Sequence, residues 1–447
     1  MVPAEPLARW IDRQYRHSAV ALMRSVSAVD IIKVRPGFGQ SVRPRKGSIV
    51  ASPVLGAYDP EPDYFFHWLR DSAIVIDALR LASEDERLGF DGLPHFADFV
   101  RFSLSLEELD GRRLVDSPSW RERIAPEYRQ YVRSDEDLSA MHGDAVVSET
   151  RFNPDGTIDI SQWHRPQNDG PFARALSVLR WSKSARLSED LRAAVDRLLR
   201  ADLQFTLRHW RDACFDIWEE EKGFHYYTLR LAAAARDAGA DWFDQRGECG
   251  DAATCRSDTA AIMKILDGYW REDAQFYRSR TLESGLPSLR ELDISVIFAA
   301  LHAAGDEKTH SVQDPRMHAT LAKLEALFDA EYAINHHRAG RAPAMGRYAG
   351  DVYYSGGAYY FSTLAAAEFC FRAARHSTAM RALINHGDAF LETVRVFTPA
   401  SGELSEQFDQ RTGEQRSAQQ LAWSYAAFIS CVAARSEAVA GMGGGPG

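Results

Sequence analysis

The chain has 447 residues, of which 45% are hydrophobic and 26% charged, a composition typical of a globular protein with a sizeable core. Its formal net charge of −10 argues against a nucleic-acid partner, because phosphate backbones are bound by concentrated basic surfaces. No apolar run reaches the roughly 18 residues of a membrane helix, and the start lacks a signal-peptide pattern, so we expect a cytoplasmic protein with no membrane partner.

Helical periodicity dominates the sequence, with apolar residues recurring at three- and four-residue steps in twelve stretches. These stretches lie near Leu7–Asp30, His67–Ser83, His95–Glu108, Pro171–Trp181, Ser188–Trp210, His225–Ala238, Ala252–Ile265, Leu289–Ala304, Asp314–Tyr332, Gly356–Arg375, Thr378–Val396 and Ser417–Ala434. The clearest strand pattern is residues 48–55, and the absence of β-α-β alternation argues against a doubly wound sheet. No motif repeats at a fixed short period, which disfavours a solenoid and leaves a bundle or a double-layered helical barrel.

Long loops rich in glycine, proline and aromatic residues separate some of these stretches. Loops of this length in a compact protein are usually functional or disordered, and their Trp and Tyr content favours function. They cover residues 31–66, 111–169, 273–288 and 333–355. Nothing resembles a domain linker, so we predict one all-α domain over residues 1–440. The glycine-rich tail 441–447 is predicted to be flexible.

The first segment that can carry chemistry is Pro62–Asp71, where aromatic residues lead into a predicted helix that begins with an Arg–Asp pair. Tyr64, Trp68 and Arg70–Asp71 would then lie at or near the helix N-terminus. The alternative is an aromatic core segment with a surface ion pair, and in isolation the segment favours that interpretation.

Two more loops combine arginine with aromatic residues. Trp163–Gly170 is a dense hydrogen-bonding loop at a helix start, and the alternative is a turn that caps the next helix through Asp169. Gly346–Gly357 places Arg347 near a Tyr–Tyr pair and flexible glycines. It is either a sugar subsite or a packed loop between helices.

Two segments supply carboxylates. Asp216–Gly223 carries three consecutive glutamates after Trp218, and such a run is most often a solvated helix end. Crowding beside an apolar ring would instead raise the proton affinity of one carboxyl, as a general acid requires. Gly402–Asp409 supplies a second carboxylate from a distant part of the chain. Two carboxylates flanking an aromatic, arginine-lined site are the minimal requirement for glycoside hydrolysis.

Taken in order, these five segments resemble glycoside hydrolase family 15, the glucoamylases and their relatives. The resemblance covers about residues 48–434 and rests on PDYFFHWLRDS, WHRPQNDGP, IWEE, DVYYSGG, and SEQFD followed by GEQRSAQQLAWSYAA. It implies an (α/α)6 barrel of six inner and six outer helices, which agrees with the twelve stretches. It also implies an inverting exo-hydrolase that releases β-D-glucose from the non-reducing ends of α-glucans or malto-oligosaccharides.

The resemblance implies a role for each residue that matches a family motif. Glu219 corresponds to the general acid and Glu406 to the general base, and Tyr64 is expected to help Glu406 hold the attacking water. The remaining positions implied to bind substrate are Trp68, Arg70, Asp71, Trp163, Arg165, Trp218, Glu220 and Arg347.

The sequence also departs from the family pattern. His164 stands where fungal glucoamylases commonly carry glycine, in a loop that could touch the sugar beyond the scissile bond. One alternative is therefore a family member specific for α-1,6 links, as in isomalto-oligosaccharides and dextran, or for trehalose. An alternative of another class is a non-catalytic sugar-binding or regulatory (α/α)6 domain, which the presence of both Glu219 and Glu406 disfavours.

Hydrolysis by two carboxylates requires no metal, so we expect no cofactor. The sequence does not decide whether a structural calcium ion binds. The expected partner is an oligosaccharide or α-glucan, and the sequence does not indicate an oligomeric state. Five scattered cysteines, an odd number, are predicted to be free thiols, with the redox state of Cys249 and Cys255 left open.

Overall fold

The computed structural model describes residues 5–56, 61–303, 305, 308–354 and 356–443. The twelve longest helices in these residues are α1 (Leu7–Met23), α2 (Leu69–Glu84), α3 (Leu93–Leu106), α7 (Asp169–Ser182), α8 (Glu189–His209), α9 (Tyr226–Asp244), α10 (Cys249–Asp267), α11 (Ser295–His302), α12 (Pro315–Glu331), α13 (Tyr360–Ala374), α14 (Met380–Phe397) and α15 (Ala422–Gly443). Each coincides with one stretch expected from periodicity, with ends that differ by up to several residues. The prediction of twelve helices is confirmed.

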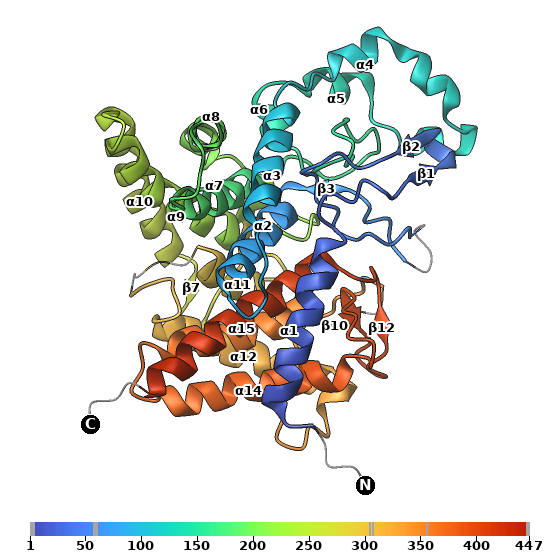
Figure 1. The fold of residues 1–447 in the computed structure, drawn as a ribbon. Coiled ribbons are helices and arrows are strands. Elements are labelled where there is room, and N and C mark those ends of the chain that lie inside the picture. The colour runs from blue at the N-terminus through green and yellow to red at the C-terminus, as the bar shows by residue number, and fades with distance from the viewer. Residues whose placement is uncertain (1–4, 57–60, 304, 306–307, 355, 444–447) are drawn as a thin grey trace.

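The long helices alternate along the chain between an outer and an inner layer (Figure 1). The inner helices α2, α7, α9, α11, α13 and α15 each pack on the next, and α15 packs back on α2, so the inner ring is closed. The outer helices α1, α3, α8, α10, α12 and α14 pack against that ring. This double ring confirms the predicted (α/α)6 barrel.

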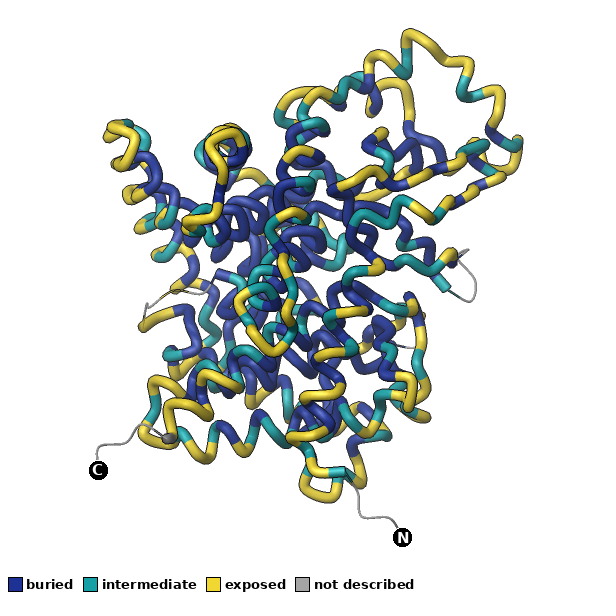
Figure 2. Tube along the Cα trace, viewed as in Figure 1, coloured by how far each residue is buried: buried dark blue, intermediate teal, exposed yellow. Residues whose placement is uncertain are grey.

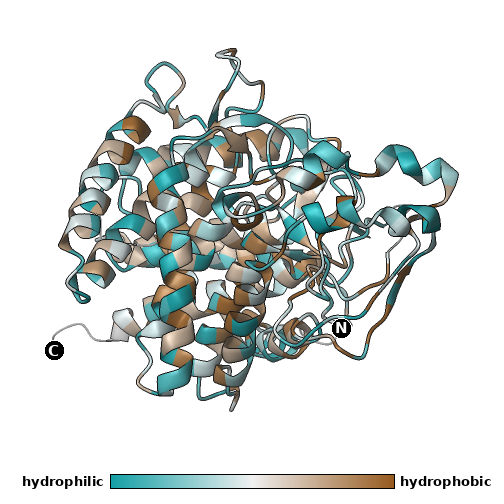
Figure 3. Cartoon of the chain, turned by 90° about the horizontal axis from the view of Figure 1, so that it is seen from above, coloured by the Kyte–Doolittle hydropathy of each residue, from teal (hydrophilic) through white to brown (hydrophobic). Residues whose placement is uncertain are grey.

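The distribution of apolar residues explains which layer a helix occupies. Inner helix α13 buries 14 of its 15 residues and is rich in Ala and Phe on every side. Outer helix α8 buries only 8 of its 21 residues, all on one face, as an amphipathic surface helix does. Figure 2 shows the resulting buried interior, and Figure 3 shows hydrophilic and hydrophobic residues mixed along the helices.

Short elements occupy the segments between the long helices. The strands are β1 (Lys33–Arg35), β2 (Gln40–Val42), β3 (His67–Trp68), β4 (Arg151–Phe152), β5 (Cys214–Phe215), β6 (Lys222–His225), β7 (Trp270–Arg271), β8 (Phe276–Tyr277), β9 (Arg280–Leu282), β10 (Ala358–Tyr359), β11 (Gln407–Phe408) and β12 (Gln415–Arg416). They pair antiparallel as β1-β2, β3-β4, β5-β6-β9, β7-β8 and β10-β11-β12. The short helices are α4 (Arg112–Asp116), α5 (Asp135–Ala140) and α6 (Asp144–Val147). With β1 and β2, α4 and α5 project from one side of the barrel in Figure 1.

The strand predicted over residues 48–55 is wrong. Only Ile49 forms a β-bridge there, an isolated one with Val26, because the segment changes partner instead of following one neighbour. Further along, the backbone N–H of Ser52 donates to the carbonyl of Tyr64 at 3.1 Å. The segment therefore joins the end of α1 to the loop that precedes α2, and it supports the backbone of Tyr64.

Two predictions concern the C-terminal tail and the five cysteines. Helix α15 continues to Gly443, so the first three residues of the predicted tail 441–447 are helical, and 444–447 lie outside the described residues. All five cysteines are free thiols, as predicted, with Cys249 exposed and Cys255 buried. In the described ranges, no helix combines the length and apolar character needed to cross a membrane.

Candidate active site

The candidate site lies at one end of the barrel. Because inner and outer helices alternate, every inner helix starts at the same end, and the loops leading into inner helices share that end. The predicted site residues lie in these loops or in the first helical turn after them. Tyr64, Trp68, Arg70 and Asp71 accompany α2, Trp163 and Arg165 precede α7, Trp218, Glu219 and Glu220 precede α9, Arg347 precedes α13, and Glu406 precedes α15.

Glu219 lies in a tight β-hairpin turn. The pairing of Phe215 with Lys222 leaves residues 216–221 to close the hairpin between β5 and β6. Glu219 adopts the left-handed conformation with φ 62°, and its N–H donates to the Asp216 carbonyl at 2.9 Å. A non-glycine residue in this region costs about 1–2 kcal/mol, so the surrounding contacts must hold it there. The solvated helix end considered for this acidic run is wrong.

Nitrogen donors from two other loops bind the Glu219 carboxylate. Trp68 Nε1 donates to its Oε1 at 2.9 Å, and Arg70 Nη2 donates to the same oxygen at 3.3 Å. Trp163 Nε1 donates to Oε2. The Glu219 side chain is only 11% exposed, so these contacts fix its orientation.

Arg70 is surrounded by three acidic side chains. Its guanidinium lies 3.4 Å from Asp71 Oδ2, 3.3 Å from Asp169 Oδ2 and 3.3 Å from Glu219 Oε1. Burial raises the pKa of Asp71 and of Asp169 to about 6, and the charge of Arg70 offsets only part of this effect. Within the described residues, Asp169 Oδ1 is buried without a hydrogen-bond donor, and Asp71 Oδ2 has the ion-pair contact with Arg70 as its polar partner.

Glu406 is buried on the loop before α15. Ser417 Oγ donates to its Oε2, and Tyr64 OH donates to its Oε1 at 3.3 Å. Burial raises the pKa of Glu406 to about 7, although the Ser417 hydrogen bond, the charge of Arg347 and the Tyr64 hydrogen bond all lower it. A carboxylate with this proton affinity accepts a proton readily near neutral pH.

One aromatic pair connects the two carboxylates. The rings of Tyr64 and Trp68 lie 5.3 Å apart between centroids at 58°. Trp68 binds Glu219 and Tyr64 binds Glu406, while Tyr64 OH also lies 2.8 Å from Tyr353 OH. Among the described residues, no hydrogen bond joins the two carboxylates directly. They are therefore positioned by opposite members of the same aromatic pair.

Glu220 faces a different set of partners from its neighbour. It accepts hydrogen bonds from Arg347 Nη2 at 3.2 Å and Tyr348 OH at 2.6 Å, and Arg290 pairs with it as well. Asp351 holds the Arg347 guanidinium through two contacts of 2.6 Å. The loops before α9, α11 and α13 thus meet at Glu220.

Trp218 is partly buried and stacks on two buried aromatic rings. Its ring lies nearly parallel to those of Phe361 and Trp423, with centroids 6.2 and 6.4 Å away. Its Nε1 donates to Asp293 Oδ2 at 2.9 Å. The Trp423 ring in turn lies 5.6 Å from the Arg70 guanidinium, so the stack supports the cluster around Arg70.

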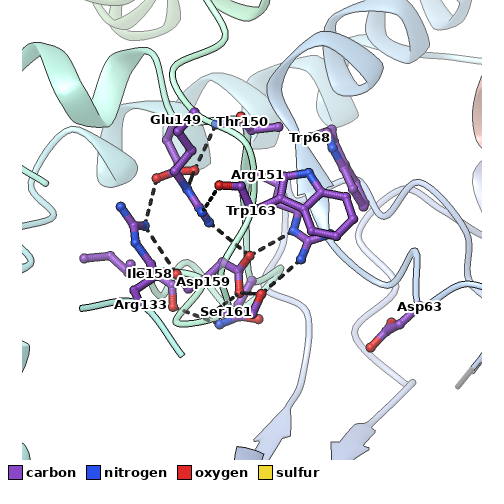
Figure 4. A network of polar contacts seen from close by, with 12 residues as sticks. Asp63, Trp68, Arg133, Glu149, Thr150, Arg151, Ile158, Asp159, Ser161 and Trp163 are labelled. Atoms are coloured by element: carbon purple, nitrogen blue, oxygen red, sulfur yellow. Dashed lines mark hydrogen bonds and ion pairs between the residues drawn. The ribbon is translucent and has the colours of Figure 1, made fainter. Parts of the chain in front are cut away.

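Arg165 makes its polar contacts with residues other than Glu219 and Glu406. It forms ion pairs with Glu149 and Asp159 and donates to the Trp163 carbonyl at 3.0 Å. Figure 4 shows this polar network next to Trp163, whose ring centroid lies 3.6 Å from the Arg151 guanidinium. Arg165 therefore supports the loop that carries Trp163.

Sequence reasoning missed several residues of this cluster. Ser417, Tyr348, Asp351, Arg290 and Asp293 all bind a predicted site residue. Ser417 and Asp351 lie inside recognised motifs. A motif does not reveal which of its polar side chains face inward, because that depends on packing between distant loops.

Arginines neutralise the acidic residues at this end of the barrel. Arg70 forms an ion pair with Glu219, Arg347 with Glu220, and Arg280 with Glu221. In the part of the chain that the structure describes, no group of three or more His, Cys, Asp or Glu side chains could hold a metal ion.

The sequence profile of one family, Glycosyl hydrolases family 15, matches residues 37–94, 127–385 and 373–433. Among similar proteins are the glucoamylase of Blastobotrys adeninivorans, 25% identical over 84% of this chain and 66% of its own length, and a probable glucoamylase of Schizosaccharomyces pombe, 27% identical over 88% and 86%.

Solved structures resemble the fold over nearly the whole chain. The family 15 glucoamylase of Hypocrea jecorina matches with a TM-score of 0.78 at 23% identity, over 97% of this chain and 73% of that one. The glucoamylase of Saccharomycopsis fibuligera matches with a TM-score of 0.76 at 20% identity, over 97% and 96%.

Proposed function

The chain belongs to glycoside hydrolase family 15, and from this premise we propose that it releases β-D-glucose from the non-reducing ends of α-linked gluco-oligosaccharides with inversion of configuration. The observation that carries the proposal is the pair of carboxylates, Glu219 and Glu406, positioned by opposite members of the Tyr64–Trp68 pair. The names of its relatives, glucoamylases, support an α-1,4-linked substrate.

The two carboxylates would divide the proton transfers between them. Protonated Glu219 gives its proton to the glycosidic oxygen as the bond to the anomeric carbon breaks. Ionised Glu406 takes a proton from a water that attacks the opposite face of the sugar, and Tyr64 OH helps to orient that water. Each turnover leaves Glu219 ionised and Glu406 protonated, and one proton exchange with solvent restores both.

The cluster around Arg70 would bind the terminal sugar. Asp71 is the accessible carboxylate of this cluster, with a side chain that is 11% exposed, and Arg70 lies beside it, held by the fully buried Asp169. Sugar hydroxyls would donate hydrogen bonds to the Asp71 carboxylate, which would orient the ring for in-line attack.

Proton NMR of the purified protein with maltotriose, isomaltotriose and trehalose in separate tubes tests the proposal. We expect early β-glucose from maltotriose, because inversion at an α-linked sugar gives the β-anomer. Early β-glucose from isomaltotriose or trehalose instead would keep the mechanism and change the linkage. Early α-glucose would contradict inversion, and no cleavage of any of the three would favour a non-catalytic role.

Ser417→Ala is expected to move the acidic limb of kcat/KM to higher pH. The base must be ionised, and burial places the pKa of Glu406 at about 7, so activity should fall as the pH drops below that value. The Ser417 hydrogen bond favours the ionised form, and its loss should raise the pKa of Glu406 by about one unit. The measurement is kcat/KM against pH for both proteins.

Ser424→Ala is the matched control for this comparison. Ser424 is also fully buried, but its hydroxyl donates to the backbone carbonyl of Ser405 at 2.8 Å and not to the carboxylate. Its acidic limb should stay at the wild-type pH. An unmoved limb in Ser417→Ala would show that Glu406 is not the group that controls it.

A further inference from the structure

We infer that His164 is a positioning residue for Glu219, acting through the main chain: its imidazole Nδ1–H donates to the backbone carbonyl of Glu219 and holds the hairpin turn that aims the carboxyl. The inference rests on the proposed role of Glu219 as the general acid.

The imidazole is held flat against the hairpin that it contacts. Nδ1 of His164 lies within hydrogen-bonding distance of the Glu219 carbonyl oxygen. Its ring stacks on Phe215, the last residue of β5, with centroids 4.6 Å apart and an interplanar angle of 8°. The His164 carbonyl accepts a hydrogen bond from Thr150 Oγ1 at 2.8 Å. Both the ring and the backbone of His164 are therefore fixed, although the residue is exposed.

The Glu219 carbonyl needs such a donor because the left-handed turn removes it from the strand ladder. Other polar groups of the turn are satisfied by Asp216, which accepts from the Glu219 N–H at 2.9 Å and from the Glu220 N–H at 2.7 Å. In the described part of the chain, His164 is the one hydrogen-bond partner of the Glu219 carbonyl. Without it, rotation of the peptide between Glu219 and Glu220 becomes easier.

Two consecutive residues thus hold Glu219 from different sides. Trp163 binds its carboxylate through Nε1, and His164 binds its carbonyl. Arg165 fixes the loop that carries both by donating to the Trp163 carbonyl at 3.0 Å. A turn that loses the His164 contact would present the Glu219 carboxyl in several orientations. Since the general acid acts in the transition state, losing the His164 hydrogen bond should lower kcat more than it raises KM.

Two substitutions separate the hydrogen bond from the stacking. His164→Phe keeps a flat ring against Phe215 but has no donor, whereas His164→Asn places an amide N–H near the position of Nδ1 without an aromatic ring. We expect His164→Phe to lower kcat about tenfold, with KM within about twofold of wild type, and His164→Asn to recover most of the loss. Because the residue is exposed, both variants should melt within a few degrees of wild type.

Other kinetic outcomes overturn the inference. A raised KM with unchanged kcat in His164→Phe would make His164 a substrate contact. A loss of kcat in His164→Asn that equals or exceeds the loss in His164→Phe would show that the amide donor does not replace the imidazole, and would overturn the assignment to the hydrogen bond. Wild-type kinetics in His164→Phe would show that the carbonyl contact does not position the acid.

A measurement that does not depend on activity separates this inference from the proposed function. Nitrogen-15 NMR of histidine-labelled protein identifies which imidazole nitrogen carries the proton, with His164→Asn to assign the signal. We expect Nδ1 of His164 to be protonated at neutral pH. A bare Nδ1 could not donate, and would overturn the inference whether or not the protein hydrolyses any of the glucosides.

Discussion

Replacing Glu219 or Glu406 with Gln is expected to lower kcat about 10²–10⁴-fold, since general acid and general base catalysis each contribute on that scale. Gln is nearly isosteric with Glu and keeps an oxygen to accept hydrogen bonds from Trp68 or Tyr64, so the fold should persist. The measurement is steady-state hydrolysis of maltotriose by each purified variant. Retention of most activity in either variant would contradict the assignment.

Two glutamates on neighbouring segments, one exposed and one partly buried, serve as controls. Glu283, 53% exposed and paired with Lys222 of the hairpin, tests the loss of an ordinary carboxylate near Glu219. Glu403 lies three residues before Glu406 and tests the loss of an ordinary carboxylate in the loop that carries Glu406. Glu283→Gln and Glu403→Gln should keep kcat within about twofold of wild type, as expected for side chains outside the reaction.

An activated substrate separates the acid from the base. Fluoride leaves α-D-glucosyl fluoride with little need for protonation, so Glu219→Gln should retain far more activity on this substrate than on maltotriose. Glu406→Gln should be impaired on both, because a water must still be deprotonated. The reverse pattern would exchange the two roles.

Replacing Arg280 with Met is expected to lower the free energy of unfolding by about 3–5 kcal/mol at pH 7, the usual cost of leaving buried charges without their partner. Arg280 is buried and pairs with Asp216, Glu221 and Asp293. Burial opposes ionisation of Asp216, yet Arg280 is the main influence that holds the pKa of this carboxyl below its usual range. Urea unfolding measures the loss.

The pH dependence of this loss identifies its cause. A carboxyl with a lowered folded-state pKa stabilises the fold above its unfolded pKa, and this contribution disappears as the pH falls through the folded value. The difference between Arg280→Met and wild type should therefore narrow on acidification below about pH 4. A difference that is constant with pH would assign the loss to packing.

Arg101→Met provides the surface comparison. Arg101 is 64% exposed and pairs with Asp98 on the same helix, so its loss should cost no more than about 1 kcal/mol. Because Asp216 also closes the Glu219 hairpin, Arg280→Met should lower activity as well, whereas Arg101→Met should not.

Much of the architecture could be read from periodicity. Helix α13 is apolar on every side and α8 on one side, and these patterns are enough to place one inside and one outside. The prediction of a strand over residues 48–55 was wrong because a short apolar run does not reveal whether a single neighbouring segment pairs with it along its whole length. Here its hydrogen bonds go to the chain near Val26 and then to Tyr64.

The site was only partly predictable. The motifs placed Tyr64 and Glu406 in loops, and the structure puts Tyr64 in contact with Glu406. The acidic run around Glu219 was more typical of a solvated helix end, and the structure places it in a hairpin. The motifs did not indicate that Ser417 reaches Glu406, or that Arg165 turns toward Glu149 instead of the carboxylates. Such contacts join loops that are far apart in the chain, and their polar side chains have no periodic pattern.

By itself, the sequence determined the twelve helices, the barrel and the family, because apolar periodicity and motif order are properties of the chain read along its length. Only the tertiary structure decided the environment of each carboxyl. Glu219, Glu220 and Glu221 are consecutive, yet each meets a different arginine, Arg70, Arg347 or Arg280. Burial and neighbouring charge set what a carboxyl can do, and both arise from the packing of separate loops at one end of the barrel.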